Sequence, residues 1–199
     1  MQAHSSQRDL FAHPAEMPEG LPSGFRYQPE FVTREEEQSL AEWIATLDLK
    51  PYEFRGYQGL RRVVSFGARY DYDSRRVARA PDFPAPLLSL RERAALWAGH
   101  AAEDIRQILV SEYSPGAPIG WHQDRPQFGD VIGVSLLAPS NFRLRRAKGK
   151  GWERKSVPLQ SRSIYLLSGE VREQWQHSIP PLAALRYSIT LRTLAQPGA

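Results

Sequence analysis

Two amphipathic helical patterns occupy the first half of the chain. Thr33 followed by Glu36 forms a capping box, a common signal for a helix N-terminus. The apolar residues after it recur at helical spacing: Leu40, Trp43, Ile44 and Leu47. A second apolar face lies within residues 85–98 and ends before Gly99; its members are Leu87, Leu90, Ala94 and Trp97. The sequence therefore predicts two helices before residue 100.

From residue 104 onward the pattern changes to short apolar or alternating runs. Glycine and proline clusters separate these runs, which lie at residues 105–113, 131–138, 141–146, 154–159, 163–168 and 185–194. Many short strands with turn signals favour a sandwich or barrel, and no repeat of solenoid length is present. Helices followed by strands predict an α+β fold in which N-terminal helices pack against a jelly-roll core.

The polar first 22 residues show no hydrophobic period, and we expect a disordered tail there with His4 and His13 solvated. The chain has 199 residues, of which 41% are hydrophobic, so it can bury one sizeable core. Residues 23–196 are therefore predicted to form a single domain.

Candidate chemistry is concentrated at His122, Asp124 and His177. Two residues separated by one lie on the same face of a β-strand, so His122 and Asp124 can meet one ion while Gln123 faces away. Two imidazoles and one carboxylate are the facial triad that holds Fe(II) with coordination positions left open. A zinc hydrolase can use the same ligand types, and the triad alone does not exclude it.

A second pattern lies near the C-terminus. Apolar and polar residues alternate from Leu185 to Thr193, which predicts a half-buried strand. Arg186 and Arg192 fall on its polar side, with Cα atoms roughly 20 Å apart at the rise of a strand. They cannot hold one carboxylate together, but their planar donors suit a small molecule with an anion at each end. The alternative is a pair of surface charges on an edge strand.

Several segments together resemble the AlkB-type Fe(II)/2-oxoglutarate dioxygenases. They are residues 112–116, 122–124 and 168–177, and the closing Arg-Tyr-Ser-Ile-Thr-Leu-Arg of residues 186–192. The resemblance covers about residues 25–194 and rests on the order and spacing of these segments. It implies a double-stranded β-helix, Fe(II) bound by the triad, and 2-oxoglutarate and O₂ as co-substrates.

The same resemblance implies roles for individual residues. Arg186 and Ser188 would hold the distal carboxylate of 2-oxoglutarate, Arg192 would lie toward the metal, and Tyr113 would hydrogen-bond the co-substrate. The implied reaction is hydroxylation of a substrate C–H bond, which releases formaldehyde from an N-methyl group and leaves an alcohol on an ordinary carbon. The metal centre carries this chemistry while the protein positions the reactants and excludes water.

Two further segments predict contacts with a substrate. Basic residues crowd an expected hairpin at residues 143–155, and two of them are candidates for following phosphates: Arg143 and Arg145. Residues 61–72 resemble the family's substrate-lid entrance, where three side chains are candidates for gripping and stacking a flipped base: Arg62, Tyr70 and Tyr72. The alternatives are a solvated turn for the first segment and half-buried strand residues for the second.

The chain departs from the best-known DNA-repair members of this family at three places. Asp124 is followed by Arg125-Pro126 where those enzymes carry an acid, Ser111 replaces an asparagine, and residues 159–163 replace a Gly-Ser pair. Our main hypothesis is oxidative demethylation of alkylated bases in DNA or RNA. The alternatives are hydroxylation of a tRNA nucleoside or a protein side chain, and a nucleic-acid-binding module without catalysis.

Composition adds little to this picture. The formal net charge is +4 and the pI is near 9.5, which is consistent with a polyanionic partner. The absence of cysteine excludes disulfides and thiolate zinc sites. Because the chain has neither an apolar leader nor an apolar run of membrane length, we expect a soluble, monomeric, cytoplasmic protein without membrane contact.

Overall fold

The computed structural model describes residues 19–54, 57–71 and 76–195. The helices within these ranges are α1 (Arg34–Ala45), α2 (Ala85–Ala98), the 3₁₀ turn η1 (Ala102–Asp104) and α3 (Gly169–Gln174). The strands are β1 (Phe25–Gln28), β2 (Lys50–Phe54), β3 (Tyr57–Phe66), β4 (Ala68–Asp71), β5 (Arg76–Arg79), β6 (Ile105–Tyr113), β7 (Ile119–His122), β8 (Phe128–Leu137), β9 (Ser140–Lys148), β10 (Gly151–Leu159), β11 (Ile164–Leu167), β12 (Gln176–Ile179) and β13 (Arg186–Leu194).

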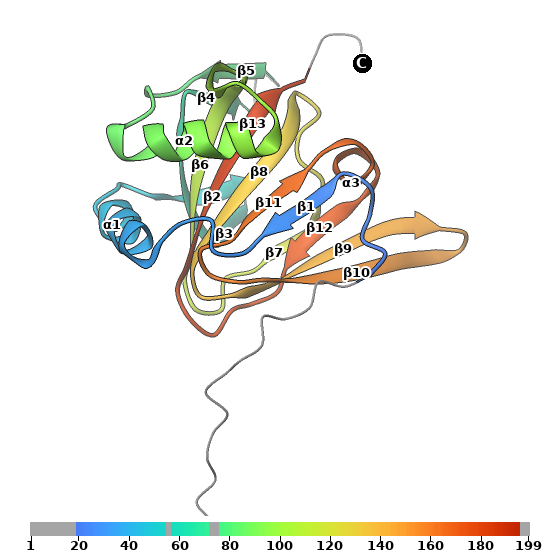
Figure 1. The fold of residues 1–199 in the computed structure, drawn as a ribbon. Coiled ribbons are helices and arrows are strands. Elements are labelled where there is room, and N and C mark those ends of the chain that lie inside the picture. Colours follow the sequence, from blue (N-terminus) through green and yellow to red (C-terminus); the bar gives the residue numbers. More distant parts are fainter. Residues whose placement is uncertain (1–18, 55–56, 72–75, 196–199) are drawn as a thin grey trace, which may run out of the picture.

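Two antiparallel sheets build the core (Figure 1). The large sheet has the strand order β1-β11-β8-β13-β6-β3-β2, the small sheet has the order β10-β9-β12-β7, and β4 pairs with β5. From β6 to β13 the chain passes repeatedly between the large and the small sheet, which is the connectivity of a jelly roll. This arrangement confirms the predicted α+β class and jelly-roll core.

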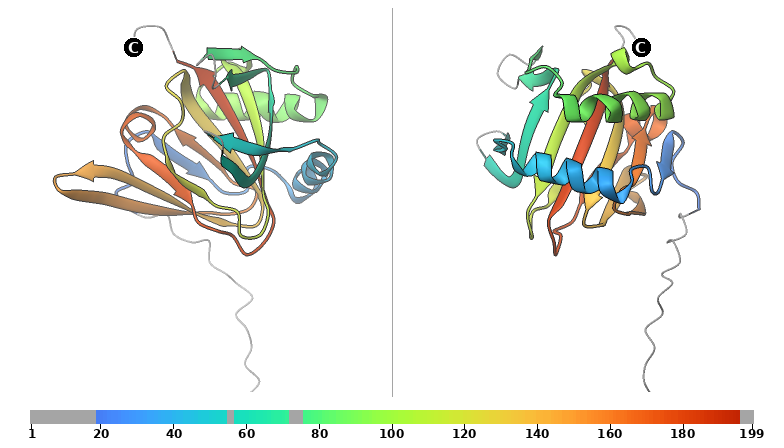
Figure 2. Two further views of the ribbon diagram at one scale, coloured as in Figure 1. Left: turned by 180° about the vertical axis from the view of Figure 1, so that it is seen from behind. Right: turned by 60° about the vertical axis from the view of Figure 1, so that its left-hand side comes forward.

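The two longer helices cover the outer face of the large sheet (Figure 2). The predicted capping box opens α1: Thr33 Oγ1 accepts a hydrogen bond from Glu36 N at 3.1 Å, and Glu36 Oε2 accepts one from Thr33 N at 2.9 Å. Helix α2 ends at Gly99, whose φ of 90° is the left-handed conformation that suits glycine. Both predicted helices are confirmed, and they pack on the apolar side of β13: Tyr187, Ile189 and Leu191.

A second apolar core fills the space between the sheets, with Phe142, Leu144, Tyr165 and Trp175 among its members. Gly133 on β8 makes room for one of these side chains. A Cβ atom at this position would lie 2.2 Å from Cζ of Tyr165, so the tyrosine ring can lie across the strand only because residue 133 is glycine.

The predicted strand at residues 185–194 is confirmed as β13, but it is not an edge strand. It pairs with β6 on one side and β8 on the other, so its polar side faces the space between the two sheets rather than solvent. The alternative of two surface arginines on an edge strand is therefore wrong. The expected basic hairpin is also confirmed. β9 and β10 pair along their whole length, with Ser140 opposite Leu159 at one end and Lys148 opposite Gly151 at the other.

Other expectations about the chain's organisation have different outcomes. β1, β2, β5 and α3 were not predicted from the sequence pattern, whereas β3 and β4 agree with the alternative of strand residues within 61–72. Most of the expected tail, residues 1–22, lies outside the described residues, and the single domain at residues 23–196 stays a prediction. Within the described residues, no helix combines the length and apolarity needed to cross a bilayer.

Candidate metal and co-substrate site

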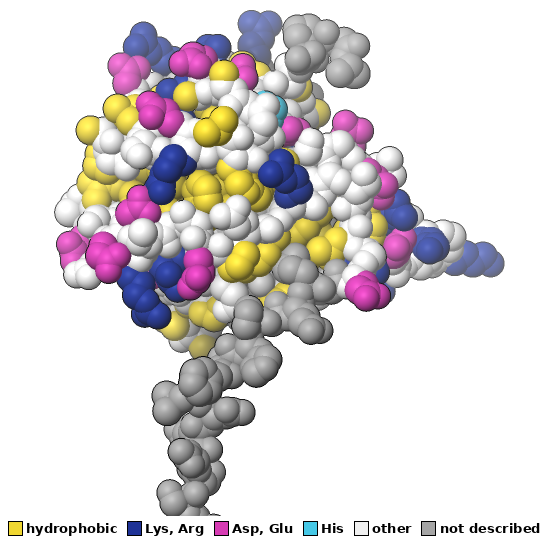
Figure 3. Space-filling model, in the orientation of Figure 1, with side chains coloured by type: hydrophobic (Ala, Val, Ile, Leu, Met, Phe, Trp, Pro, Cys, Tyr) yellow, Lys and Arg dark blue, Asp and Glu magenta, His cyan; other side chains and the backbone are white. Residues whose placement is uncertain are grey.

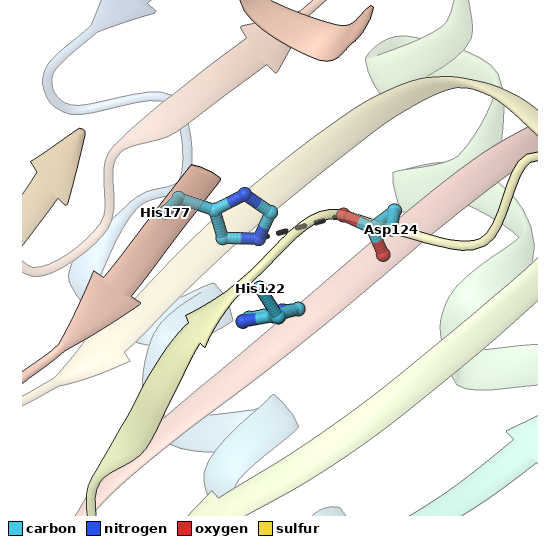
Figure 4. Close-up of side chains that lie close together, drawn as sticks. All are labelled: His122, Asp124 and His177. Atoms are coloured by element: carbon cyan, nitrogen blue, oxygen red, sulfur yellow. Dashed lines mark ion pairs between the residues drawn. The ribbon is translucent and has the colours of Figure 1, made fainter. Parts of the chain in front are cut away.

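His122, Asp124 and His177 meet between the two sheets (Figure 4). His122 ends β7 and is paired in register with His177 on β12, which places their ring centroids 4.2 Å apart. Asp124 Oδ2 lies 3.5 Å from His177 Nε2, and one potential ligand atom from each residue lies within 4.8 Å of the others. The structure thus brings together the three residues that the sequence pattern selected.

The local backbone differs from the expected strand. β7 ends at His122, so Asp124 lies in the coil that follows rather than two residues along a strand. The expectation that Gln123 faces away holds: its Nε2 donates to the carbonyl of Glu173 at 2.8 Å.

The two histidines are arranged as neutral ligands. His122 Nδ1 lies 2.9 Å from the carbonyl oxygen of Gly120, which can only accept, so Nδ1 carries the proton and Nε2 offers its lone pair. Burial lowers the pKa of His122, and burial together with the neighbouring His122 lowers the pKa of His177 to about 3. Neutral imidazole is the form that binds a metal ion.

Asp124 supplies the negative charge of this cluster. Burial opposes its ionisation, but the positive guanidinium of Arg192 outweighs burial and holds the pKa of the carboxyl well below its usual range. Arg192 Nε and Nη2 donate to Asp124 Oδ1 at 3.0 and 2.6 Å, which leaves Oδ2 directed at the imidazoles. Two neutral imidazoles and one oriented carboxylate fit a divalent transition-metal ion such as Fe(II).

Arg172 fixes the segment that follows Asp124. Its guanidinium donates to three backbone carbonyls of that segment, at 2.6–2.8 Å: Arg125, Phe128 and Gly129. The residue lies in the Gly-Glu-x-Arg stretch that is part of the family resemblance, but this contact could not be predicted from the sequence pattern. It holds the backbone of that segment, and its positive charge also helps to lower the pKa of the Asp124 carboxyl.

Arg186 provides a buried binding position for an anion, separate from the three metal-ligand candidates. Its side chain is fully buried, Nη2 donates to Ser135 Oγ at 2.6 Å, and the guanidinium carbon lies 5.1 Å from the centre of the Tyr113 ring. Among the described residues, neither Nε nor Nη1 has a partner. A buried guanidinium with free donors fits a carboxylate, as 2-oxoglutarate would supply. Ser188 lies two residues along the same face of β13 and is also buried.

The structure places Arg61 at the site, although the sequence analysis selected its neighbour Arg62. The prediction for Arg62 is therefore corrected. Arg61 is buried, donates to Tyr113 Oη at 3.5 Å and stacks on Tyr52 with its guanidinium carbon 4.3 Å from the ring centre. Arg62 lies on the other face of β3, where it pairs with Glu112 at 3.1 Å. Adjacent strand residues must face opposite sides, and the sequence did not reveal which arginine faces inward.

A cavity of about 620 Å³ opens beside the triad, between β7 on one side and β2, β3 and β4 on the other. Tyr70 lines it, and the guanidinium carbon of Arg125 lies 5.2 Å from the Tyr70 ring centre. Further charged or aromatic lining residues are Tyr52, Arg61, Arg69, Trp121, Asp124 and Arg192. The stacking of Tyr70 on a base stays a prediction, and Tyr72 lies outside the described residues.

Arg143 and Arg145 do not line this cavity. They lie on β9, on the face of the small sheet opposite to His177, and their Nε atoms donate to Ser178 Oγ at 3.0 Å and to Gln176 Oε1 at 2.8 Å. Any contact they make with a substrate must therefore take place outside the cavity.

Comparison with known proteins agrees with the geometry. Residues 24–192 match the family model described as the 2OG-Fe(II) oxygenase superfamily. An Arabidopsis thaliana protein named "Alkylated DNA repair protein ALKBH8 homolog" is 33% identical over 181 residues, which cover 76% of this chain and 49% of the relative. The mouse "tRNA (carboxymethyluridine(34)-5-O)-methyltransferase ALKBH8" is 30% identical over 170 residues, which cover 82% of this chain and 25% of the relative.

A bacterial relative and a solved structure extend the comparison. The "Alpha-ketoglutarate-dependent dioxygenase AlkB" of Salmonella typhimurium is 30% identical over 132 residues, or 58% of each chain. The structure of OsALKBH1 superposes with a TM-score of 0.68 at 16% identity, covering 89% of this chain and all of that one, so it supports the fold alone. The chain spans between a quarter and six tenths of the length of these curated relatives.

The family model covers most of the chain, and its chemistry requires the metal and co-substrate that the buried triad and Arg186 are shaped to hold. The chain therefore belongs to the 2OG-Fe(II) oxygenase superfamily as an AlkB-type enzyme that uses Fe(II), 2-oxoglutarate and O₂.

Proposed function

We propose that this protein oxidatively removes alkyl groups from bases in nucleic acid. The observation that carries the proposal is the cavity beside the triad. Tyr52 and Tyr70 line it with rings that suit a planar base, and its described lining residues include four guanidinium groups and one carboxylate, that of Asp124. Such a lining favours a flat, anionic substrate over an uncharged aliphatic one.

In this proposal each side chain of the site has a defined task. His122, Asp124 and His177 hold Fe(II), and Arg192 positions Asp124 through its bond to Oδ1. Arg186 holds the distal carboxylate of 2-oxoglutarate, assisted by the hydroxyls of Ser188 and Tyr113 on the same side of the large sheet. The bound metal, with 2-oxoglutarate and O₂, supplies the oxidising power that converts a substrate C–H bond into C–OH.

The remaining contributions come from the protein. Burial of Arg186 and Tyr113 excludes water from the co-substrate, which strengthens the electrostatic contacts that orient it. The pair formed by Arg125 and Tyr70 borders the cavity and would face a base that enters it. Hydroxylation of an N-methyl group on that base gives a hydroxymethyl group, which leaves as formaldehyde and restores the N–H.

The test begins with anaerobic reconstitution of the full chain with Fe(II) and 2-oxoglutarate. Oxygen is then admitted with a mixed pool of methylated tRNA and methylated DNA oligonucleotides, and succinate, formaldehyde and nucleoside masses are measured. We expect succinate together with loss of methylene mass from one class of nucleoside. Asp124→Ala is the negative control, since it removes one metal ligand, and it should abolish both products.

A second candidate function is stable hydroxylation of a tRNA nucleoside. It is favoured by the name of the mouse relative, which describes an enzyme that acts on tRNA, and by Arg125-Pro126 in place of the acid that follows the metal-binding aspartate in the repair enzymes. In the same experiment this activity would add one oxygen to a tRNA nucleoside and release no formaldehyde. Succinate without any change in nucleic acid would instead favour a protein side chain as the substrate. Nucleic-acid binding with no succinate would favour a binding module.

A further inference from the structure

The outer face of the small sheet carries arginines stacked between tryptophans. The guanidinium carbon of Arg145 on β9 lies 4.4 Å from the ring centre of Trp121 on β7 and 4.1 Å from that of Trp152 on β10. Arg143 lies over Trp121 as well, at 5.2 Å. Because three strands contribute to this row, it continues across the sheet; we call Trp121, Arg145 and Trp152 the stacking ladder.

Strand alternation separates this row from the metal site. Phe142 and Leu144 point inward and are buried between the sheets, so Arg143 and Arg145, the next residues along β9, point outward. Their guanidinium groups are held by neutral partners on β12, Ser178 for Arg143 and Gln176 for Arg145. Trp152 remains 42% exposed, so one indole of the ladder is open to a partner.

The positive charge of the outer face is not neutralised by nearby acids. Glu153 and Glu170 pair with Arg146, at 2.9 and 2.7 Å, and Lys148 also pairs with Glu153, at 3.7 Å. In the described part of the chain, Arg143, Arg145 and the exposed Arg154 have no carboxylate within ion-pair distance. The hairpin of β9 and β10 projects from the body of the molecule (Figure 1), and Lys and Arg side chains gather along it (Figure 3).

The stacking ladder is continuous with the cavity. Trp121 lines the cavity and directly precedes the metal-ligand candidate His122 on β7. We propose that the outer face of the small sheet binds single-stranded nucleic acid that flanks the nucleotide in the cavity. Unpaired bases stack on Trp152 and on the Trp121–Arg145 pair, while phosphates contact Arg143, Arg145 and Arg154. This inference rests on the proposed function and adds a binding surface for the nucleotides that flank its substrate base.

The chemistry of the ladder favours a single strand over other polyanions. In a duplex the base faces are covered by their neighbours, whereas unpaired bases can stack on aromatic side chains and on guanidinium planes. An acidic peptide would use the positive charge but would leave the exposed indole of Trp152 without a matching surface. A solvated hairpin that only maintains solubility needs neither the indoles nor their alignment with the arginine.

The test measures binding of a fluorescently labelled, unmodified single strand of about 12 nucleotides, a common site size for such proteins. Fluorescence anisotropy is recorded on the full-length, metal-free chain. Trp152→Ala should raise Kd by roughly tenfold or more, the usual effect of losing one base-stacking aromatic. Arg145→Lys, which keeps the positive charge but removes the planar guanidinium group, should also weaken binding. Arg154→Ala should reduce the slope of log K against log salt by about 0.7.

Lys148→Ala is the matched control. It removes one positive charge from the same hairpin, but from a side chain that pairs with Glu153 rather than one on the outer face. We expect it to change Kd by less than about threefold, because its ammonium group is directed to Glu153 and makes no contact with a strand on the outer face. Circular dichroism and thermal unfolding of each variant verify that the fold is retained. Arg154→Ala, whose side chain is exposed, keeps the inference testable should Arg145→Lys be unstable.

The outcomes separate this inference from the proposed function because binding is measured without turnover. Weaker binding by Trp152→Ala and Arg145→Lys supports the inference even if no demethylation is ever detected. Equal Kd values for Trp152→Ala and the unaltered protein overturn it, even if demethylation is found. A duplex bound as tightly as the single strand would overturn it too, as would full displacement of the oligonucleotide by an equal concentration of a polyglutamate peptide.

Discussion

Replacing Arg186 with methionine should separate co-substrate binding from folding. The side chain is fully buried, and among the described residues its only hydrogen bond goes to Ser135 Oγ, with Nε and Nη1 unpartnered. A buried charge without a counter-charge is costly, and a well-packed apolar side chain in its place is often neutral or stabilising by about 1–4 kcal/mol. We therefore expect the free energy of unfolding of the ligand-free Arg186→Met protein to be unchanged or higher.

The effect on the co-substrate should be opposite in sign. Beyond its bond to Ser135, the guanidinium keeps enough free N–H groups to form two hydrogen bonds to a carboxylate, each contributing about 1.5–3 kcal/mol when one partner is charged. Losing both costs about 3–6 kcal/mol, which corresponds to a rise of at least about a hundredfold in Kd for 2-oxoglutarate. A substitution that only damaged the fold would lower stability and co-substrate affinity together. A protein that is at least as stable but cannot bind 2-oxoglutarate therefore indicates a direct contact between Arg186 and the co-substrate.

Two measurements check this prediction. Urea unfolding of both proteins without ligand gives the stability difference, and anaerobic calorimetric titration of the Fe(II)-loaded proteins with 2-oxoglutarate gives the affinities. Arg62→Met is the control, since this arginine pairs with Glu112 on the other face of β3 and should leave the Kd for 2-oxoglutarate unchanged. The reasoning is wrong if Arg186→Met binds 2-oxoglutarate within about threefold of the unaltered protein, or if it is markedly less stable.

Three further predictions concern packing, pH and the backbone around the triad. Gly133→Ala should destabilise the protein by about 1–3 kcal/mol in urea unfolding because its methyl group meets the Tyr165 ring, and adding Tyr165→Leu should restore part of the loss; no rescue would contradict the contact. The pKa of His177 is about 3 in the folded protein and near 6.5 when unfolded, so the unfolded chain binds more protons below about pH 6.5 and the metal-free protein loses stability as pH falls from there toward 3. Unfolding at pH 7 and pH 5 should differ by about 2 kcal/mol from this residue, and an equally steep pH dependence in His177→Gln would refute the assignment. Arg172→Lys should lower Fe(II) affinity by about 10- to 100-fold, measured by competition with a chelator, because it releases the segment that carries Asp124, and unchanged affinity would show that this segment holds itself in place.

The features that could be predicted from sequence are those with a local physical cause. The capping box at Thr33 and Glu36 depends on residues three apart, and the end of α2 depends on one glycine that can adopt a positive φ. The alternation along β13 is also local, so its polar and apolar sides could be assigned before its neighbours were known. The triad was predicted from the ligand types that Fe(II) accepts, taken together with the arginine strand and with the order and spacing of the segments that resemble the AlkB-type family.

The features that could not be predicted depend on contacts between distant segments. Arg61 and Arg62 are equivalent by pattern, and only the pairing of β3 with β6 decides that Arg61 faces the cavity. Whether Asp124 lies in a strand depends on where β7 stops. The approach of Tyr165 to Gly133 depends on β11 pairing with β8, more than thirty residues away in sequence. In each case the local pattern allows two arrangements and tertiary structure selects one.

The small sheet places its two proposed tasks on opposite faces of the same strands. On β7, Trp121 faces outward and His122 inward; on β12, Gln176 faces outward, where it orients Arg145, and His177 inward. Neighbouring residues of one strand have a fixed separation, so the stacking ladder and the metal ligands cannot move independently. A single-stranded nucleic acid bound on the outer face would therefore present one particular nucleotide to the cavity. A slip of one residue in the pairing of β7 with β12 would turn the ligand outward and the tryptophan inward, so both tasks would be lost together.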